Sequence, residues 1–164
     1  MPVVTLITDF GNKDYAVAAV KGAVLSTVEN PQIIDISHQI EPYNVTQAAY
    51  ILKNAYKSFP KGSIHIVGVE SEKTPENDHL AMFFDGHYFL GADNGIFSMI
   101  MGDLKADKIV TINIHDQSAI TVPVLDAFIK VAAHLSRNGT LEVIGKATPQ
   151  IRELVELRPV INPT

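Results

Sequence analysis

The chain of 164 residues has no cysteine, no tryptophan and only three arginines. Without cysteine, the protein can have no disulfide framework, no cysteine-bearing zinc site and no thiol nucleophile. Lysine and arginine together number 13 against 18 acidic residues, and the net charge is −5, so nucleic acid is not an expected partner. No apolar run reaches the roughly 18 residues of a membrane span. These absences predict a cytoplasmic protein that binds neither nucleic acid nor a membrane.

Two glycine-rich phosphate-binding patterns are also missing. No G-x-G-x-x-G follows the first predicted strand, and no G-x-x-x-x-G-K-[ST] occurs anywhere. Both patterns bring backbone N–H groups close to phosphate oxygens. Their absence argues against a dinucleotide site and against a P-loop.

The hydrophobic content of 46% is sufficient for a substantial core in a chain of this length. Strand patterns alternate with helix patterns, which predicts an α/β fold with a largely parallel sheet, helices on both faces and an added β-hairpin around residues 85–87. The α/β domain is expected to span residues 1–157, with 158–164 as a linker-like tail. Strands are predicted at 3–8, 33–37, 64–69, 80–84, 88–92 and 108–114, and helices at 15–28, 44–59, 93–104, 125–137 and 149–157.

Polar residues follow four of the predicted strands. They are Asp9, His38, Glu70 and Asp93. Ligands of open α/β sheets bind at the carboxyl ends of the strands, so these residues mark a candidate site. Acidic groups there suit hydroxyl groups or a cation better than a phosphate. Asp9 can accept both hydroxyls of a ribose, or it can simply cap the next helix.

The polar stretch 70–78 is predicted to be an exposed loop, either a solvated excursion or a lid. His79 and His87 lie in polar loop or turn sequences, where a solvated histidine is expected. His65 and His134 lie on apolar patterns instead, and we expect them to be packed and hydrogen-bonded in the core.

Four segments occur in the order of a known family. They are T-D-F-G-x-x-D followed by K-G (8–22), D-I-S-H-x-I-x-P (35–42), F-P-K-G-S-I-H (59–65) and A-D-N-G (92–95). Together they resemble the N-terminal domain of the S-adenosylmethionine (SAM) hydroxide adenosyltransferases, relatives of the SAM-dependent chlorinase and fluorinase. The resemblance covers nearly the whole chain.

The resemblance implies that SAM is the substrate, without a cofactor or a metal, and that water attacks the ribose C5′ while methionine leaves. It also implies a homotrimer whose sites lie between one α/β domain and the next subunit's C-terminal β-barrel, a domain expected to be absent from this chain. Asp9 matches the ribose-binding aspartate, Asp14 a residue near the methionine end, and Tyr43 a residue lining the ribose pocket. Substrate contacts are therefore expected from Asp9, Phe10, Asp14, Tyr43 and Asn94, although the role of Asn94 could be mainly structural.

The sequence departs from the family at the residues that handle water. Where the family has V-D-P-G-V-G-T-x-R-R, this chain has Glu70 for the aspartate, and Asn77 and Asp78 at the candidate arginine positions. Pro123 stands where the family has a histidine. We therefore expect Glu70, assisted by His79, to orient the water. The alternative is a non-catalytic domain that binds SAM or adenosine.

Overall fold

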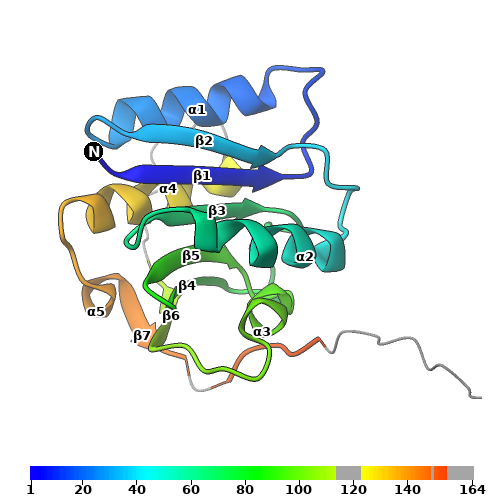
Figure 1. Cartoon of the computed structure of the whole chain (residues 1–164), viewed down its shortest axis with the longest axis vertical. Coiled ribbons are helices and arrows are strands. Elements are labelled where there is room, and N and C mark those ends of the chain that lie inside the picture. The colour runs from blue at the N-terminus through cyan, green and yellow to red at the C-terminus, as the bar shows by residue number, and fades with distance from the viewer. Residues whose placement is uncertain (114–122, 149, 155–164) are drawn as a thin grey trace, which may run out of the picture.

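The computed structural model describes residues 1–113, 123–148 and 150–154. The predicted tail 158–164 lies outside this part. Within the described residues, seven strands form one sheet, and Figure 1 shows the helices that cover it. Its strands are β1 (Val3–Thr8), β2 (Gln32–Ser37), β3 (Ile64–Gly68), β4 (His79–Phe84), β5 (His87–Ala92), β6 (Lys108–Ile112) and β7 (Gly145–Ala147). Its helices are α1 (Ala16–Thr27), α2 (Val45–Ala55), α3 (Ile96–Met101), α4 (Pro123–Ser136) and α5 (Leu141–Ile144), with a 3₁₀ turn, η1, at Tyr56–Ser58.

The strand order is β2-β1-β3-β5-β4-β6-β7. β1 pairs in parallel with β2 and β3, and β3 pairs in parallel with β5. The other three pairs, β4 with β5, β4 with β6 and β6 with β7, are antiparallel. The predicted α/β class is confirmed, but the sheet is mixed rather than largely parallel. The reason is that β4 turns back at Asp85–Gly86 and lies between β5 and β6, so β6 has an antiparallel neighbour.

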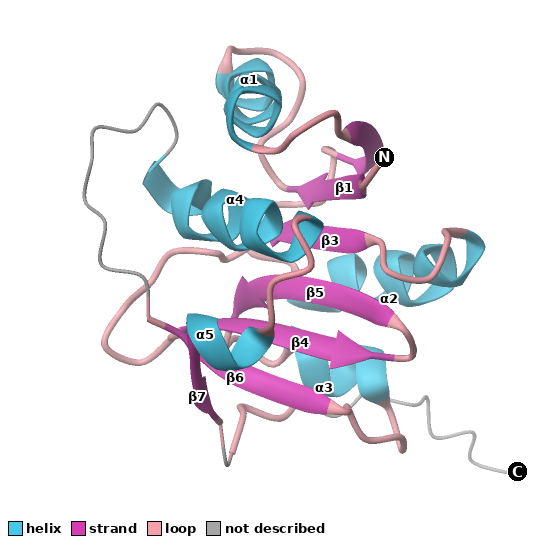
Figure 2. Ribbon diagram, turned by 90° about the vertical axis from the view of Figure 1, so that its left-hand side faces the viewer, coloured by secondary structure: helices cyan, strands magenta, loops and turns pink. Residues whose placement is uncertain are grey.

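Helices cover both faces of the sheet (Figure 2). α1 and α4 pack on one face, and α2 and α3 pack on the other. The interior strand β1 contributes to both layers, because successive side chains of a strand point to opposite faces. Leu6 packs in the α1/α4 layer and Ile7 in the α2/α3 layer, and both are fully buried.

The start of α2 follows from its sequence. Asn44 is the N-cap, and its side chain accepts a hydrogen bond from the Gln47 N–H at 2.9 Å, as predicted. In a simple capping box the Gln47 side chain would accept a hydrogen bond from the N–H of Asn44. Here it accepts one from the Glu41 N–H, three residues earlier, at 2.9 Å. These bonds secure the chain between β2 and α2, where Tyr43 lies.

Two predicted helices differ from the structure. α3 begins at Ile96, after Gly95 in the left-handed conformation, and ends at Met101 rather than near residue 104. Residues 150–154 are not helical and instead run along α3, where the Leu154 N–H donates to the Ser98 hydroxyl. This contact is made across a large sequence separation, so a local pattern does not contain it.

Gly95 provides a test of how residues 150–154 pack. Its φ is +97°, and a β-carbon there would overlap the Leu154 side chain. We expect Gly95→Ala to destabilise the fold by about 1–2 kcal/mol in chemical denaturation, because the left-handed backbone is strained by a β-carbon and the Leu154 side chain must move away from it. Gly22→Ala is the control, because Gly22 lies inside α1 with open space around it. That change should stabilise the fold by about 0.5–1 kcal/mol. Equal stability of Gly95→Ala and the wild type would contradict this packing.

A buried histidine pair lies at the amino-terminal side of the sheet. The rings of His65 and His87 meet at 3.0 Å between Nε2 and Nδ1, and the Thr5 hydroxyl contacts Nδ1 of His65 at 2.6 Å. The exposed fractions are 0% for His65 and 1% for His87. The expectation for His65 is confirmed, whereas the solvated state expected for His87 is wrong. His87 begins β5 and lies two residues before Phe89, so both rings lie on the sheet face covered by α2 and α3, beside Tyr56.

Candidate active site

The candidate site lies where the chain changes direction across the sheet. From β1 the chain passes through α1 to β2 on one side, and then through α2 to β3 on the other. Such a switch point, at the carboxyl ends of neighbouring parallel strands, is where ligands of open α/β sheets bind. The ends of β1 and β3 meet there, and the Asp9 N–H donates to the Gly68 carbonyl at 3.3 Å.

Among the described residues, the Asp9 carboxylate is anchored through one of its two oxygens. Its Oδ2 accepts a hydrogen bond from the Tyr43 N–H at 3.0 Å. Tyr43 has a φ of +61°, and its side chain is 69% exposed. The structure thus brings two of the predicted site residues, Asp9 and Tyr43, together across the switch point, with the phenol ring turned toward solvent.

Glu70 and Asn94 are two further predicted site residues that the structure brings together. The Asn94 amide donates to the carbonyl groups of Val69 and Glu70, at 3.1 and 3.0 Å. Its oxygen accepts from the Ile96 N–H at the start of α3. Asn94 is buried and binds backbone on both sides. This geometry supports a structural role, in which Asn94 fixes the backbone that carries Glu70.

Backbone strain gathers at this site. Among the described residues, five other than glycine have a positive φ, and three of them are Asn or Asp, which tolerate this conformation. The remaining two are Tyr43 and Glu70. Each is held by another predicted site residue, Tyr43 by Asp9 and Glu70 by Asn94. Strain that is held in place this way is common at functional sites.

Phe10 and Asp14 lie on the chain between β1 and α1. Phe10 is partly buried against the α1/α4 layer. The Asp14 carboxylate accepts from the Ala16 N–H at 2.8 Å in an exposed position, which satisfies one free donor at the helix start. Their contacts with a substrate remain predictions.

His79 is buried, so its expected solvated state is wrong. Its Nε2 donates to the Ser71 carbonyl at 2.6 Å, and its ring packs on Phe128 with centroids 4.4 Å apart. Burial lowers the pKa of His79, and the Ser71 bond offsets this only in part. A neutral imidazole here ties the loop 70–78 to α4. Its role in orienting water stays a prediction.

Arg152 is a residue that sequence reasoning missed. It lies far along the chain, yet its N–H donates to the Asp93 carboxylate at 2.8 Å and its guanidinium to the Glu76 carbonyl at 3.2 Å. Arg152 therefore joins the end of β5, through its backbone N–H, to the loop 70–78, through its guanidinium. No local pattern signals this contact. Pro123, at the family's histidine position, begins α4, and its side chain lies outside the described part.

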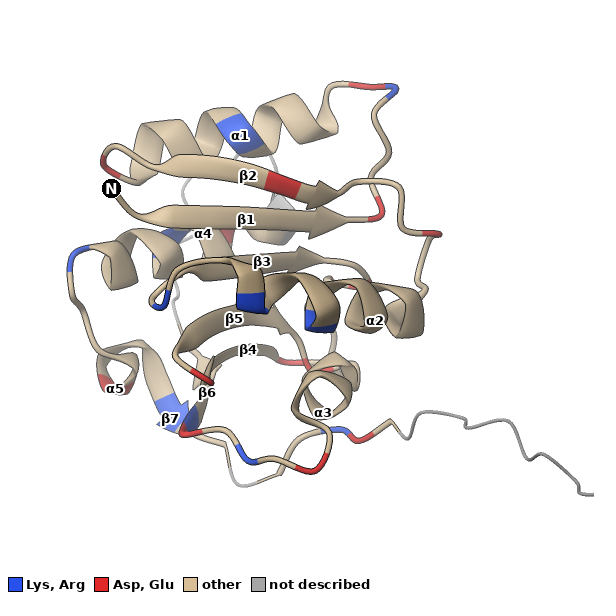
Figure 3. Cartoon of the chain, in the orientation of Figure 1, with Lys and Arg blue, Asp and Glu red and all other residues tan. Residues whose placement is uncertain are grey.

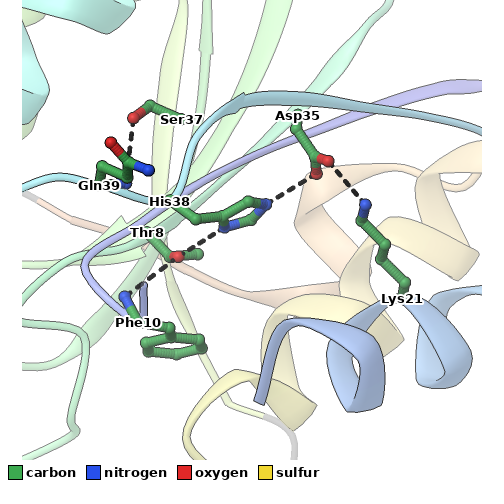
Figure 4. A network of polar contacts seen from close by, with 7 residues as sticks. All are labelled: Thr8, Phe10, Lys21, Asp35, Ser37, His38 and Gln39. Carbon is green, nitrogen blue, oxygen red and sulfur yellow. Dashed lines mark hydrogen bonds and ion pairs between the residues drawn. The ribbon is translucent and has the colours of Figure 1, made fainter. Parts of the chain in front are cut away.

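A polar network supports the turn after β1 (Figure 4). Lys21 and His38 each donate to a different oxygen of Asp35, at 2.6 and 2.7 Å, and Nδ1 of His38 contacts the Thr8 hydroxyl at 2.7 Å. Partial burial raises the pKa of Asp35, but the bonds from Lys21 and His38 outweigh it and the net pKa is lowered. Asp35 is therefore ionised at neutral pH and can only accept hydrogen bonds.

Acidic residues predominate in the loops at the carboxyl ends of β1 and β2 (Figure 3). Asp9, Asp14 and Glu41 lie there with one lysine, Lys13. This balance favours a cationic or hydroxyl-bearing ligand. Within residues 1–113, 123–148 and 150–154, no three histidine or acidic side chains come together as a metal site requires. No helix in the described part is long and apolar enough to cross a membrane.

Comparisons with known proteins agree with the motifs. The chain is 33% identical, over 118 residues, to a protein of Methanocaldococcus jannaschii named (R)-S-adenosyl-L-methionine hydrolase, covering 69% of this chain and 44% of that one. It is 30% identical over 63 residues to a fluorinase of Actinopolyspora mzabensis, covering 38% and 21%. A crystal structure of an uncharacterized conserved protein from Thermotoga maritima matches with a TM-score of 0.85 at 27% identity, over 98% of this chain and 63% of that one.

The chain thus spans less than two thirds of each of these relatives. The family pattern described as the SAM hydroxide adenosyltransferase N-terminal domain matches residues 4–145. The four motifs, the switch-point geometry and this match lead to one conclusion: the chain belongs to the SAM hydroxide adenosyltransferase family.

Proposed function

We propose that this protein binds SAM at the carboxyl ends of β1 and β3 and cleaves it with water to adenosine and methionine. The observation that carries the proposal is the pairing of Asp9 with Tyr43 and of Glu70 with Asn94 at the switch point. Asp9 receives the ribose hydroxyls, because its Oδ2 is already oriented by the Tyr43 N–H. The acidic surroundings favour the sulfonium cation of SAM.

In the proposed reaction, a water oxygen forms a bond to C5′ of the ribose and the C5′–S bond breaks. Methionine leaves with the bonding electron pair, which neutralises its sulfonium, and the water gives up a proton. Glu70 is proposed to accept that proton or to orient the water, since it is the acidic group at the end of β3. The sulfonium is already a good leaving group, so positioning supplies a large share of the rate.

The assay incubates the full chain with SAM and follows adenosine and methionine by liquid chromatography. General-base catalysis is typically worth about 100-fold or more. Glu70→Gln is therefore expected to lower kcat by about 100-fold, while the adenosine Kd changes less than about threefold. Glu72→Gln is the matched control, because it makes the same charge change at an exposed position of the same loop. Unchanged turnover of Glu70→Gln would remove Glu70 from the mechanism.

The second candidate function is a domain that binds SAM or adenosine without cleaving it. The observation that favours it is the reduced set of polar groups at the water site. Nε2 of His79 is occupied by the Ser71 carbonyl, and the Arg152 guanidinium binds the Glu76 carbonyl. Nucleoside binding with intact SAM in the assay would support this function. The homotrimer and the cytoplasmic location implied above are likewise proposals, and sedimentation tests the first.

A further inference from the structure

His38 holds the turn that carries Asp9 through two contacts. Figure 4 shows the first of them, between the His38 ring and Thr8. On the side-chain side, Nδ1 of His38 lies 2.7 Å from the Thr8 hydroxyl, which also accepts the Phe10 N–H at 3.3 Å. On the backbone side, the His38 carbonyl accepts the Gly11 N–H at 2.7 Å. Asp9 lies between these contacts in the sequence, so they fix the backbone that carries its carboxylate.

The imidazole of His38 has a defined hydrogen-bonding pattern. Asp35 can only accept, so Nε2 of His38 carries a proton and donates it to Asp35 at 2.7 Å. Nδ1 is then left to accept from the Thr8 hydroxyl, whose oxygen accepts the Phe10 N–H. His38 is only 5% exposed, so water cannot readily replace these bonds.

We propose that His38, oriented by Asp35, is a positioning residue that directs the Asp9 carboxylate at the ribose diol of the substrate. This inference rests on the proposed function, since it concerns the same nucleoside site. The proposed role involves no contact between His38 and the substrate, because Thr8 and the turn lie between them. Positioning of this kind matters since hydrogen bonds to a diol require both carboxylate oxygens in one orientation.

Two substitutions separate the two nitrogens of the ring. The amide of asparagine occupies the region of Nδ1, so His38→Asn can keep the bond to Thr8. The longer glutamine places its amide near Nε2, so His38→Gln keeps the bond to Asp35 and loses Thr8. Thr8→Val removes the same bond from the other partner with little change in shape, and it serves as the second variant if His38→Gln does not fold.

The experiment measures calorimetrically the ratio of the Kd for 2′,3′-dideoxyadenosine to the Kd for adenosine, together with amide hydrogen exchange at Phe10 and Gly11. His38→Gln or Thr8→Val is expected to lower the ratio at least about tenfold and to speed exchange at both amides. His38→Asn is expected to change the ratio less than about threefold. In the cleavage assay, the loss should appear in KM more than in kcat.

A merely structural role would lower stability without changing the ratio in the folded protein. An unchanged ratio in both His38→Gln and Thr8→Val would therefore overturn the inference, as would an equal loss in His38→Asn and His38→Gln. A wild-type ratio of one is a different result, because it would overturn the ribose-binding step of the proposed function itself. The exchange rates then show separately whether His38 orders the turn.

Discussion

Asp9→Asn is expected to weaken adenosine binding by roughly 100-fold or more while the protein remains folded. Hydrogen bonds to a charged group are worth about 1.5–3 kcal/mol each, and the proposed diol contact contains two. The asparagine oxygen can still accept from the Tyr43 N–H, so the strained conformation of Tyr43 keeps its anchor. The amide nitrogen that replaces the second oxygen is a donor and cannot accept from a ribose hydroxyl.

Calorimetry with adenosine and with 2′,3′-dideoxyadenosine measures this effect. Glu41→Gln is the matched control, since Glu41 is an exposed carboxylate at the same edge of the sheet and Gln47 binds its backbone N–H rather than its side chain. The control should bind adenosine within about threefold of the wild type. If Asp9→Asn binds adenosine as tightly as the wild type, Asp9 does not hold the ribose.

Acid is expected to destabilise the fold well before its carboxylates are protonated. Burial, together with the charge of its neighbour His87, lowers the pKa of His65 to about 3, and burial also lowers the pKa of His87. Tyr56, Asp85 and Lys61 flank this pair; burial raises the pKa of Tyr56 to about 12, so it stays neutral. As the pH falls below about 6.5, these histidines become protonated in the unfolded chain but remain neutral in the folded protein.

Proton linkage gives the sign and the size of this change in stability with pH. When folding lowers the pKa of a histidine, stability is unaffected above about pH 6.5. It falls as the pH decreases from about 6.5 to the pKa of the folded state. For His65 alone, the free energy of unfolding falls by roughly 1 kcal/mol per pH unit in this range, or roughly 2 kcal/mol between pH 6.5 and 4.5. Carboxyls with lowered pKa values, those of Asp35, Asp85 and Glu142, contribute mainly below that range.

Urea denaturation at several pH values from 4.5 to 7.5 measures this slope. His65→Phe is expected to be less stable at pH 7.5, because the Thr5 hydroxyl loses its partner, but its slope should be shallower by about one proton. Phe59→Leu is the control, since its ring packs on His65 without titrating. It should lower stability equally at every pH. A wild-type stability that is flat over this range would contradict a buried neutral His65.

Much of the local structure could be predicted from short patterns. The β-branched run 3–8 forms β1, and Asn44 caps α2, because both features depend on neighbours within a few residues. The order of polar residues after the strands also predicted where the site lies, since carboxyl ends of parallel strands meet at one edge. Asp9 and Glu70 are therefore found at adjoining strand ends.

The burial of histidines could not be predicted in the same way. His79 and His87 stand beside polar turn residues, so their local sequence is typical of a solvated loop. Both begin strands, however, and a strand's pleat decides which way its first side chain points. His79 points toward Phe128 of α4, and His87 toward His65 of β3.

The sequence by itself determined the family, most of the elements and the residue types available for chemistry. Only the tertiary structure decided which of these residues meet. Tyr43 meets Asp9 across 34 positions, Asn94 meets Glu70 across 24, and Arg152 meets Glu76 across 76. A pattern of neighbouring residues reports local conformational preference, whereas these contacts depend on how strands are ordered and where the chain crosses the sheet. The sequence therefore supplies the residue types of the candidate site, whereas the packing of strands and helices sets the distances between them.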